Sequence, residues 1–211
     1  FMRNITAFLK LPKNSYIADL PCGKGRHSVY LNSLGYKVTG GDLSENSILH
    51  AKQFENDSLD FEVWDMRKAL ENKYDAIFNL FTSFGYFDDD NEDITILKSI
   101  KNGLQENGVF VMDFLNVEKV KNNIVSEEIK SVDGIDFHIK REIKNGFILK
   151  HISFTADNQK HSYTEQVKFL TLEKMRTYFD KAGLKIKHTF GDYSLNNFNK
   201  NTSDRLILIA E

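Results

Sequence analysis

The sequence contains one cysteine, two prolines and no long apolar run among its 211 residues. A single cysteine excludes an internal disulfide framework, and no apolar stretch approaches the roughly 20 residues that a membrane-spanning helix needs. The chain also has no secretory signal pattern, so we expect a cytoplasmic protein that does not associate with membranes. Because Phe1 precedes Met2, we expect the natural N-terminus to be longer or remodelled.

A strong charge of either sign is also lacking. The formal net charge is -2 and the pI is about 6.3, which gives no electrostatic reason to bind nucleic acid. No repeat, low-complexity tract or proline-rich linker divides the chain. With 41% hydrophobic residues the chain can form one full core, so we expect a single domain over residues 1–211, as a monomer or a homodimer.

The first half of the chain alternates short apolar runs with helix-like stretches. The runs are rich in branched and aromatic residues and end at Gly, Asn or Asp, which is typical of buried strands. The predicted strands are residues 15–20, 36–42, 59–64, 74–80 and 108–114, and the predicted helices are residues 26–34, 44–54 and 91–104. Ser44 and either Asp90 or Asn91 are predicted helix caps. The alternation predicts an α/β fold with a doubly wound, mostly parallel sheet and helices on both faces.

The pattern changes after Asn116. Residues 129–169 are β-rich, and turn signals at Lys144-Asn145-Gly146 and Asp157-Asn158 predict antiparallel hairpins. A predicted helix at residues 172–182 and predicted strands at residues 184–190 and 205–210 follow. We therefore predict that residues 117–170 form a β-rich insertion after the fifth strand, packed on the main domain as a lid or a wall of a substrate pocket.

Three successive predicted strands end beside a carboxylate, at Asp19, Asp42 and Asp65. In an open parallel sheet, ligands bind beyond the carboxyl ends of the strands. Gly23 and Gly25 follow the first strand, where glycine lets the backbone approach a ligand and the next helix presents free N–H groups. Asp42 is placed to accept hydrogen bonds from ribose hydroxyls, although taken alone it would equally cap the next helix.

The ligand of such a loop is either a dinucleotide or a cationic nucleoside. The dinucleotide motif G-x-G-x-x-G needs a third small residue, which Ser28 only approximates, so NAD is weakly indicated. Asp19 would repel a pyrophosphate, whereas a hydrogen bond from an ammonium group to it is worth roughly 1.5 to 3 kcal/mol. A ligand with ribose, adenine, a carboxylate and an ammonium group fits better, and S-adenosylmethionine is such a ligand.

Five segments, in order, resemble the motifs of class I S-adenosylmethionine-dependent methyltransferases: IADLPCGKGRHS, VTGGDLS, VWDMR, YDAIFNLFTSFGYF and NGLQENGVFVMDFLN. The resemblance spans most of residues 15–116 and, less distinctly, the last helix and two strands. It implies a seven-stranded sheet whose last strand, residues 205–210, inserts antiparallel. It also implies S-adenosylmethionine as the methyl donor and S-adenosylhomocysteine as the product.

The resemblance further implies a role for each matching residue. The implied cofactor contacts are Asp19, Leu20, Pro21, Cys22, Gly23 and Gly25 around the methionine part, Asp42 at the ribose hydroxyls, Leu43, Asp65 and Met66 at adenine, and Asn79, Leu80 and Phe81 beside the transferable methyl. Two residues depart from the common pattern. Pro21 replaces a glycine and removes a backbone N–H, and Lys24 stands where a smaller residue is usual, so both are expected to alter the loop.

Candidates for contact with the methyl acceptor come from several segments. They are Phe84, Tyr86, Asn116, Arg141 and Arg205, with His138, His151 and Tyr163 as further polar residues of the insertion. Tyr86 and His151 are the candidates for proton transfer, which is needed only if the acceptor must lose a proton before attack. Cys22 is not expected to act as a nucleophile, because direct displacement on a sulfonium requires no thiolate. The acidic run at residues 88–93 is predicted to be a solvated helix N-terminus, and no metal site is expected.

The sequence thus predicts methyl transfer to a nitrogen or oxygen of a small molecule by direct in-line displacement. Two alternatives stay open. One is methylation of an RNA base or a protein, although the acidic run near the predicted pocket disfavours a polyanionic substrate. The other is a non-catalytic module that binds S-adenosylmethionine, which would be indicated if side chains of the insertion filled the acceptor pocket.

Overall fold

The computed structural model describes all of residues 1–211 as a main body with a second, separate sheet. The elements of the body are α1 (Met2–Leu9), β1 (Tyr16–Asp19), α2 (Arg26–Ser33), β2 (Lys37–Asp42), α3 (Glu45–Ala51), β3 (Leu59–Val63), β4 (Tyr74–Asn79), α4 (Asp90–Gly103), β5 (Leu104–Leu115), α5 (Val117–Asn122), α6 (Leu172–Ala182), β10 (Ile186–Phe190) and β11 (Arg205–Ala210). None of the helices combines the length and the apolar character needed to cross a bilayer.

The body is built on a seven-stranded sheet with the order β10-β11-β5-β4-β1-β2-β3. β1 pairs in parallel with β2 on one side and with β4 on the other, so the strand order reverses beside β1. β11 runs antiparallel to both β5 and β10. The predicted doubly wound sheet with an antiparallel last strand is therefore confirmed, and its switch point lies next to the glycine loop that follows β1.

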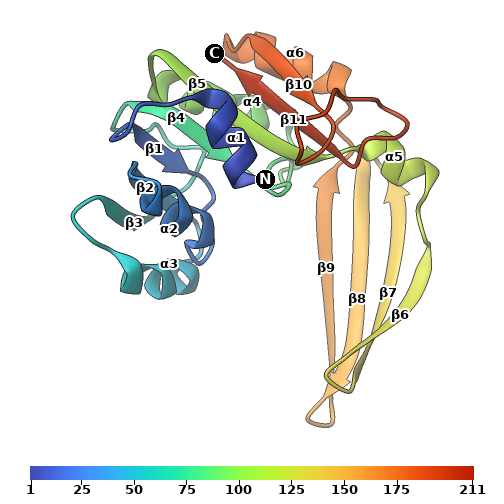
Figure 1. Cartoon of the computed structure of the whole chain (residues 1–211). Helices are drawn as coiled ribbons and strands as arrows, with labels where there is room; N and C mark the ends of the chain where they lie inside the picture. Colours follow the sequence, from blue (N-terminus) through green and yellow to red (C-terminus); the bar gives the residue numbers. More distant parts are fainter.

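Both faces of this sheet are covered by helices (Figure 1). Side chains alternate between the faces, so that Ile17 packs in one core cluster and its neighbour Ala18 packs in the other. The cluster around Ile17 includes Ile5 of α1, Leu31 of α2 and Ile48 of α3, and the cluster around Ala18 includes Leu97 of α4 and Phe179 of α6. Two apolar cores thus hold the strand ends in fixed relative positions.

Several predicted boundaries shift in the structure. Ser44 caps α3 as predicted, accepting from the N–H of Ser47, but Asp89 rather than Asp90 or Asn91 caps α4. α1 was not predicted, because no polar side chain caps its start at Phe1. β5 begins at Leu104 rather than at residue 108.

The insertion forms a four-stranded antiparallel sheet, here called the arm, of β6 (Glu127–Val132), β7 (Ile135–Lys144), β8 (Phe147–Ala156) and β9 (Gln159–Lys168). Its hairpins turn at Asp133-Gly134, Asn145-Gly146 and Asp157-Asn158, six residues that all have positive φ. The sequence signals identified the last two turns. Asp133-Gly134 was missed although it is an equally typical hairpin pair.

The arm projects from the body, which corrects the prediction that the insertion packs on the main domain (Figure 1). Every residue of β6 is exposed. Ile148 of β8 and Val167 of β9, at the end of the arm nearest the body, are among the few arm residues that pack in or against the main core. The arm is instead held by cross-strand contacts of its own, such as the tilted pair of Phe137 and Phe154 with ring centroids 4.7 Å apart.

A buried ion pair fastens the base of the arm. Lys168, at the end of β9, donates to Asp93 at 2.6 Å and lies 3.0 Å from Asp90, with only 5% of its side chain exposed. Asp93 is fully buried in the first turns of α4. The acidic run at residues 88–93 is thus not simply a solvated helix start, because two of its carboxylates hold the arm.

We expect Lys168→Met to lower the free energy of unfolding by about 3 to 5 kcal/mol, because it leaves the buried Asp93 carboxylate without its cation. Urea unfolding measures the change. Lys174→Met is the matched control, since the exposed pair of Lys174 with Asp90 should contribute about 0 to 1 kcal/mol. The double variant Lys168→Met/Asp93→Leu should regain most of the loss. Equal losses in the two single variants would contradict a special role for the buried pair.

Candidate functional site

The glycine loop and Asp42 meet at the carboxyl edge of the sheet. Gly23 and Gly25 have φ values of 55° and 82°, which L side chains rarely adopt, and a Cβ on Gly25 would lie 2.7 Å from the Phe61 ring. Asp42 accepts hydrogen bonds from the N–H of Gly23 at 2.8 Å and from the N–H of Ser44 at 2.9 Å. Asp42 therefore orders the loop and caps the next turn, and both of its oxygens keep a lone pair for a ligand.

Asp19 lies beneath this loop and is almost completely buried. It accepts from the hydroxyl of Ser28 at 2.7 Å. Burial, with a smaller contribution from the charge of Asp42, raises the pKa of Asp19 to about 7. Near neutral pH this carboxyl is close to balanced between its two protonation states, and a cation bound beside it would favour the charged form.

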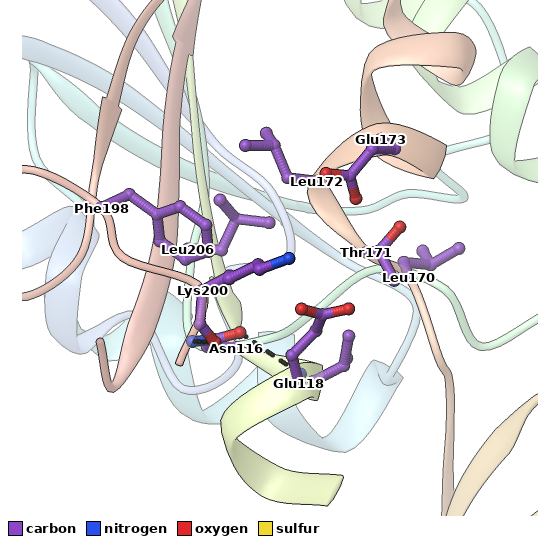
Figure 2. Close-up of a pocket in the computed structure, with 10 residues that line it drawn as sticks. Asn116, Glu118, Leu170, Thr171, Leu172, Glu173, Phe198, Lys200 and Leu206 are labelled. Atoms are coloured by element: carbon purple, nitrogen blue, oxygen red, sulfur yellow. Dashed lines mark hydrogen bonds between the residues drawn. The ribbon is translucent and has the colours of Figure 1, made fainter. Parts of the chain in front are cut away.

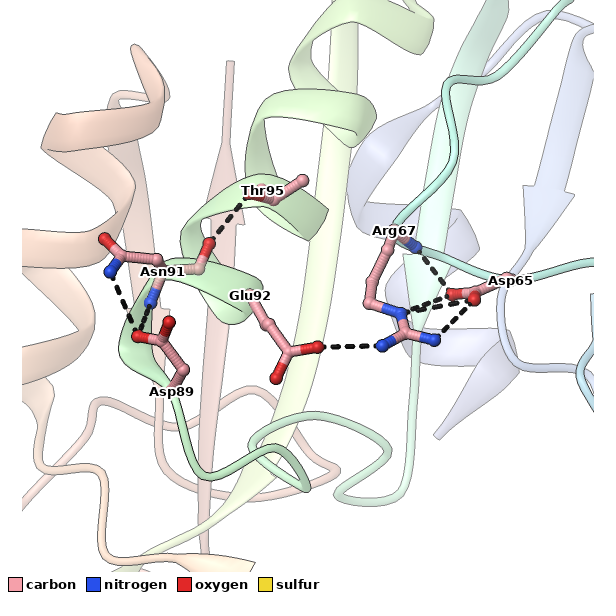
Figure 3. Close-up of polar contacts among 6 residues, drawn as sticks. All are labelled: Asp65, Arg67, Asp89, Asn91, Glu92 and Thr95. Atoms are coloured by element: carbon pink, nitrogen blue, oxygen red, sulfur yellow. Dashed lines mark hydrogen bonds and ion pairs between the residues drawn. The ribbon is translucent and has the colours of Figure 1, made fainter.

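Asp65 is held by its neighbour Arg67 (Figure 3). The guanidinium donates to both oxygens of Asp65, at 2.7 Å from Nη2 and 3.0 Å from Nε, and Nη1 donates to Glu92 at 2.8 Å. The hydrogen bonds from Arg67 keep the pKa of Asp65 below its usual range. Asp65 therefore stays ionised with a fixed orientation, and sequence reasoning did not anticipate Arg67.

The carboxyl end of β4 carries an unpartnered polar atom. Asn79 is buried and its amide donates to the carbonyl oxygens of Leu20 and Ser83, but its Oδ1 has no hydrogen-bond partner. A buried acceptor of this kind normally has a donor. Leu80 is buried beside it, whereas Leu43 and Phe81 expose 63% and 41% of their surface. An open acceptor, open space around Gly23 and exposed apolar side chains fit a ligand with polar and apolar parts.

Phe81 also lines a cavity of about 720 Å³ between the body and the arm, here called the arm cavity. Its other lining residues are Thr82, Tyr86, Leu115, Val120, Arg141, Ile148, Lys150, Thr164, Glu165, Gln166 and Val167. Of the predicted acceptor contacts, Tyr86 and Arg141 therefore lie at this cavity. Phe84 does not, because it is 1% exposed and belongs to the core.

Asn116 and Arg205 are not brought into the arm cavity. Asn116 is buried and donates to the carbonyl oxygens of Lys200 and Ser203, beside a separate void of about 10 Å³ (Figure 2). Such a void has room for about one water molecule. Arg205 donates through Nε to Asp113 at 2.7 Å and through Nη2 to Thr82 at 3.0 Å. Both side chains make hydrogen bonds that stabilise the fold near the site, and neither lines the arm cavity.

The two predicted proton-transfer residues have other partners. His151 follows Lys150 on β8, so its side chain lies on the other, outer face of the arm. There it contacts Glu142 and Thr164, and Thr164 also belongs to the lining of the arm cavity. The hydroxyl of Tyr86 donates to the carbonyl of Thr82 at 2.8 Å, and burial raises the pKa of Tyr86. His138 pairs with Ser153 on the same outer face as His151, and Tyr163 is exposed farther along the arm.

Two further side chains border the glycine loop. Burial raises the pKa of the Cys22 thiol, which disfavours the nucleophilic thiolate form. His27, in the first turn of α2, stacks on Phe81 with ring centroids 4.7 Å apart. Burial and the charge of Arg26 lower the pKa of His27, so this ring is neutral at pH 7. The sequence alone gave no signal for this stacking.

We expect Asp19→Asn to stabilise the protein at neutral and higher pH. The pKa of Asp19 is raised above its ordinary value of 3.8, so its contribution to stability is complete below about pH 4 and is lost as pH rises to 7. The asparagine does not titrate. The stability of the variant relative to wild type should therefore rise by roughly 3 kcal/mol between pH 4 and pH 8, as measured by urea unfolding at each pH. If the difference in free energy of unfolding between Asp19→Asn and wild type did not change with pH, the raised pKa of the buried Asp19 carboxyl would be contradicted.

Comparison with known proteins agrees with this geometry. Residues 17–108 match a family model described as a methyltransferase domain. YqeM of Bacillus subtilis, a protein named as a methyltransferase, is 34% identical over 107 residues, which cover 49% of this chain and 43% of YqeM. The chain thus spans less than half the length of this curated relative.

Two further proteins are similar over most of the chain. The dTDP-3-amino-3,4,6-trideoxy-alpha-D-glucopyranose N,N-dimethyltransferase of Streptomyces venezuelae is 24% identical over 191 residues, covering 86% of this chain and 80% of that enzyme. The crystal structure of an S-adenosylmethionine-dependent methyltransferase from Clostridium acetobutylicum superposes with a TM-score of 0.85 at 19% identity, covering 100% of this chain and 88% of the other. Residues 17–108 thus match the methyltransferase-domain model, and the whole chain has the fold of an S-adenosylmethionine-dependent methyltransferase.

Proposed function

We propose that the protein transfers the methyl group of S-adenosylmethionine to a nitrogen of a small amine, of which an amino sugar is the first candidate. The position of Phe81 carries this proposal. Phe81 lies two residues after the end of β4, at the same sheet edge as Asp19 and Asp42, and it also lines the arm cavity. A cofactor at the glycine loop and an acceptor in the arm cavity would therefore meet at this side chain.

The residues at the strand ends would hold the cofactor as the family resemblance implies. The loop from Asp19 to Gly25 would surround the methionine part, Asp42 would accept from the ribose hydroxyls, and Leu43 would pack on adenine. Asp65 would accept from the adenine amino group beside the backbone of Met66. Asn79 and Leu80 would lie near the methyl group, where the unpartnered Oδ1 of Asn79 supplies an acceptor.

The cofactor supplies a methyl group on a cationic sulfur, so the chain has mainly to align the acceptor and exclude water. Aromatic faces attract cations, and two partly exposed rings line the arm cavity, that of Tyr86 and that of Phe81, on which His27 stacks. Ile148, Val167 and Leu115 give the cavity an apolar floor that would shield the reacting atoms.

The side chains of the arm cavity favour nitrogen over oxygen as the acceptor atom. A hydroxyl group must lose a proton to a base before or during attack, whereas a neutral amine already has a free lone pair. No histidine lines the cavity, and its one carboxylate, Glu165, pairs with Lys150 at 3.0 Å. Tyr86 stays protonated and donates to Thr82, so it is also unsuited to act as a base.

The open volume of the arm cavity supports an enzyme rather than a non-catalytic module, because side chains of the arm do not fill it. An RNA or other polyanionic acceptor is less favourable, since Asp88 and Asp90 lie on the α4 side of the arm base. The Streptomyces venezuelae enzyme is named for methylation of an amino sugar, which supports the same acceptor class here.

We expect Asp42→Ala to weaken the binding of S-adenosylmethionine by about 10- to 100-fold, because hydrogen bonds to a charged acceptor contribute roughly 1.5 to 3 kcal/mol. Titration calorimetry measures the affinity, with NAD in a parallel titration. Asp60→Ala is the control, because Asp60 lies at the opposite end of the parallel strands and should leave the affinity unchanged. Binding of NAD in place of S-adenosylmethionine would overturn the proposal.

We further expect a dTDP-linked 3-amino sugar to gain a methyl group when it is incubated with the protein and S-adenosylmethionine, as followed by mass spectrometry. The matching 3-hydroxy sugar should not react, because it needs a base that the arm cavity lacks. Methylation of the hydroxy sugar alone would contradict a nitrogen acceptor. Methylation of added RNA with neither sugar reacting would favour the nucleic-acid alternative.

A further inference from the structure

Phe81 and Thr82 have a backbone conformation that their side chains disfavour. Their φ values are 58° and 65°, so two consecutive residues with a Cβ lie in the left-handed region. Both line the arm cavity, two and three residues after the end of β4. Strained backbone of this kind persists only where surrounding groups hold it, and it concentrates at functional sites.

The group that holds this turn is Asp113. The carboxylate of Asp113 accepts from the N–H of Phe81 at 3.0 Å, and its backbone carbonyl accepts from the N–H of Thr82 at 2.9 Å. Asp113 lies in the interior of β5 and has no exposed surface. Both amide groups of the left-handed turn are thus fixed by one residue of the neighbouring strand.

Arg205 completes the arrangement from the first position of β11. Its Nε donates to Asp113 at 2.7 Å and its Nη2 donates to the hydroxyl of Thr82 at 3.0 Å, so one guanidinium bridges the carboxylate and the turn. Only 18% of its side chain is exposed. The backbone ladder between β5 and β11 is complete without this pair, so the sheet itself does not require these side chains.

Tyr193 provides a third donor to the same carboxylate. Its hydroxyl lies 3.3 Å from Asp113, and its ring packs 5.8 Å from the ring of Phe81. The buried carboxylate of Asp113 therefore accepts from three donors in three separate segments, Phe81, Tyr193 and Arg205. These contacts surround the left-handed turn that borders the cavity. The hydrogen bond from Tyr86 to the Thr82 carbonyl extends the arrangement to a further wall of the cavity.

We propose that Asp113 and Arg205 are positioning residues for methyl transfer. They hold Phe81 and Thr82 in the left-handed turn that separates the cofactor loop from the arm cavity, and so set the alignment of the acceptor with the methyl group. This role rests on the proposed function. Alignment chiefly governs the rate of the transfer step, so loss of the pair should lower kcat more than it weakens cofactor binding.

The first test compares Arg205→Gln with wild type in methyl transfer to the dTDP-linked 3-amino sugar. We expect kcat to fall by about tenfold or more, while the Kd for sinefungin changes by less than about threefold. Arg205→Lys should recover little, because an ammonium group lacks the fork that bridges Asp113 and Thr82. The control is Lys187→Gln on the neighbouring strand β10, which removes an exposed ion pair with Glu211, the residue after β11.

A second variant separates positioning from general stability. Thr82→Gly adopts positive φ without a Cβ penalty, so Arg205→Gln should cost a much smaller factor in kcat in the Thr82→Gly background than in wild type. Because Thr82→Gly also removes the hydroxyl that Arg205 contacts, Thr82→Ala is the matched background, which loses the hydroxyl and keeps the Cβ. Arg205→Gln should cost a larger factor in Thr82→Ala than in Thr82→Gly, and equal factors in these two backgrounds would overturn the proposal.

The third measurement needs no acceptor, so it decides the matter even if the amino sugar is not a substrate. A crystal structure of Arg205→Gln should show Phe81, Thr82 or both with negative φ. Unchanged left-handed values in that variant would overturn the proposal. Absence of methyl transfer by the wild-type protein, together with the expected backbone change in Arg205→Gln, would count against the proposed function and not against the role of the pair.

Discussion

The site depends on one constraint, which is that the carboxyl ends of parallel strands meet at the same edge of a sheet. β1, β2 and β4 run in parallel, so residues far apart in the sequence, such as Asp19, Asp42 and Asn79, come together at that edge. The two apolar cores fix the strands, and this in turn fixes the polar groups. The reversal of strand order beside β1 opens the edge there and leaves room for a ligand.

Buried ion pairs attach the parts that the two cores do not hold. Lys168 and Asp93 fasten the arm to α4, and Arg205 and Asp113 fasten the turn after β4 to the far strands. Breaking such a pair is costly because it leaves a charge without a partner in a medium of low polarity. Each pair lies next to residues that line the arm cavity, since Lys168 follows Val167 and Arg205 donates to Thr82. The cavity is therefore shaped by these ion pairs together with the apolar core, to which Ile148 belongs.

Most strands and helices of the body could be predicted because they follow a local pattern, with short apolar runs in strands such as residues 74–79 and capping at Ser44. The glycine loop and the three strand-end carboxylates were predicted for the same reason. Asn116 and Arg205 were predicted to contact the acceptor because both lie near strand ends. In the structure Asn116 instead donates to the carbonyl oxygens of Lys200 and Ser203. Arg205 donates to Asp113 and Thr82.

The sequence by itself determined the fold class, the order of the motifs and the carboxylates at the ligand edge, because these depend on short-range periodicity and on the rule for parallel strands. Only the tertiary structure decided that the arm projects and which of its faces borders the cavity. It also decided which charged side chains form ion pairs with one another. These properties depend on contacts between residues 75 to 123 positions apart, as between Lys168 and Asp93 or Arg205 and Thr82. No local pattern encodes such contacts, because a charged residue looks the same in the sequence whether its partner is water or a buried carboxylate.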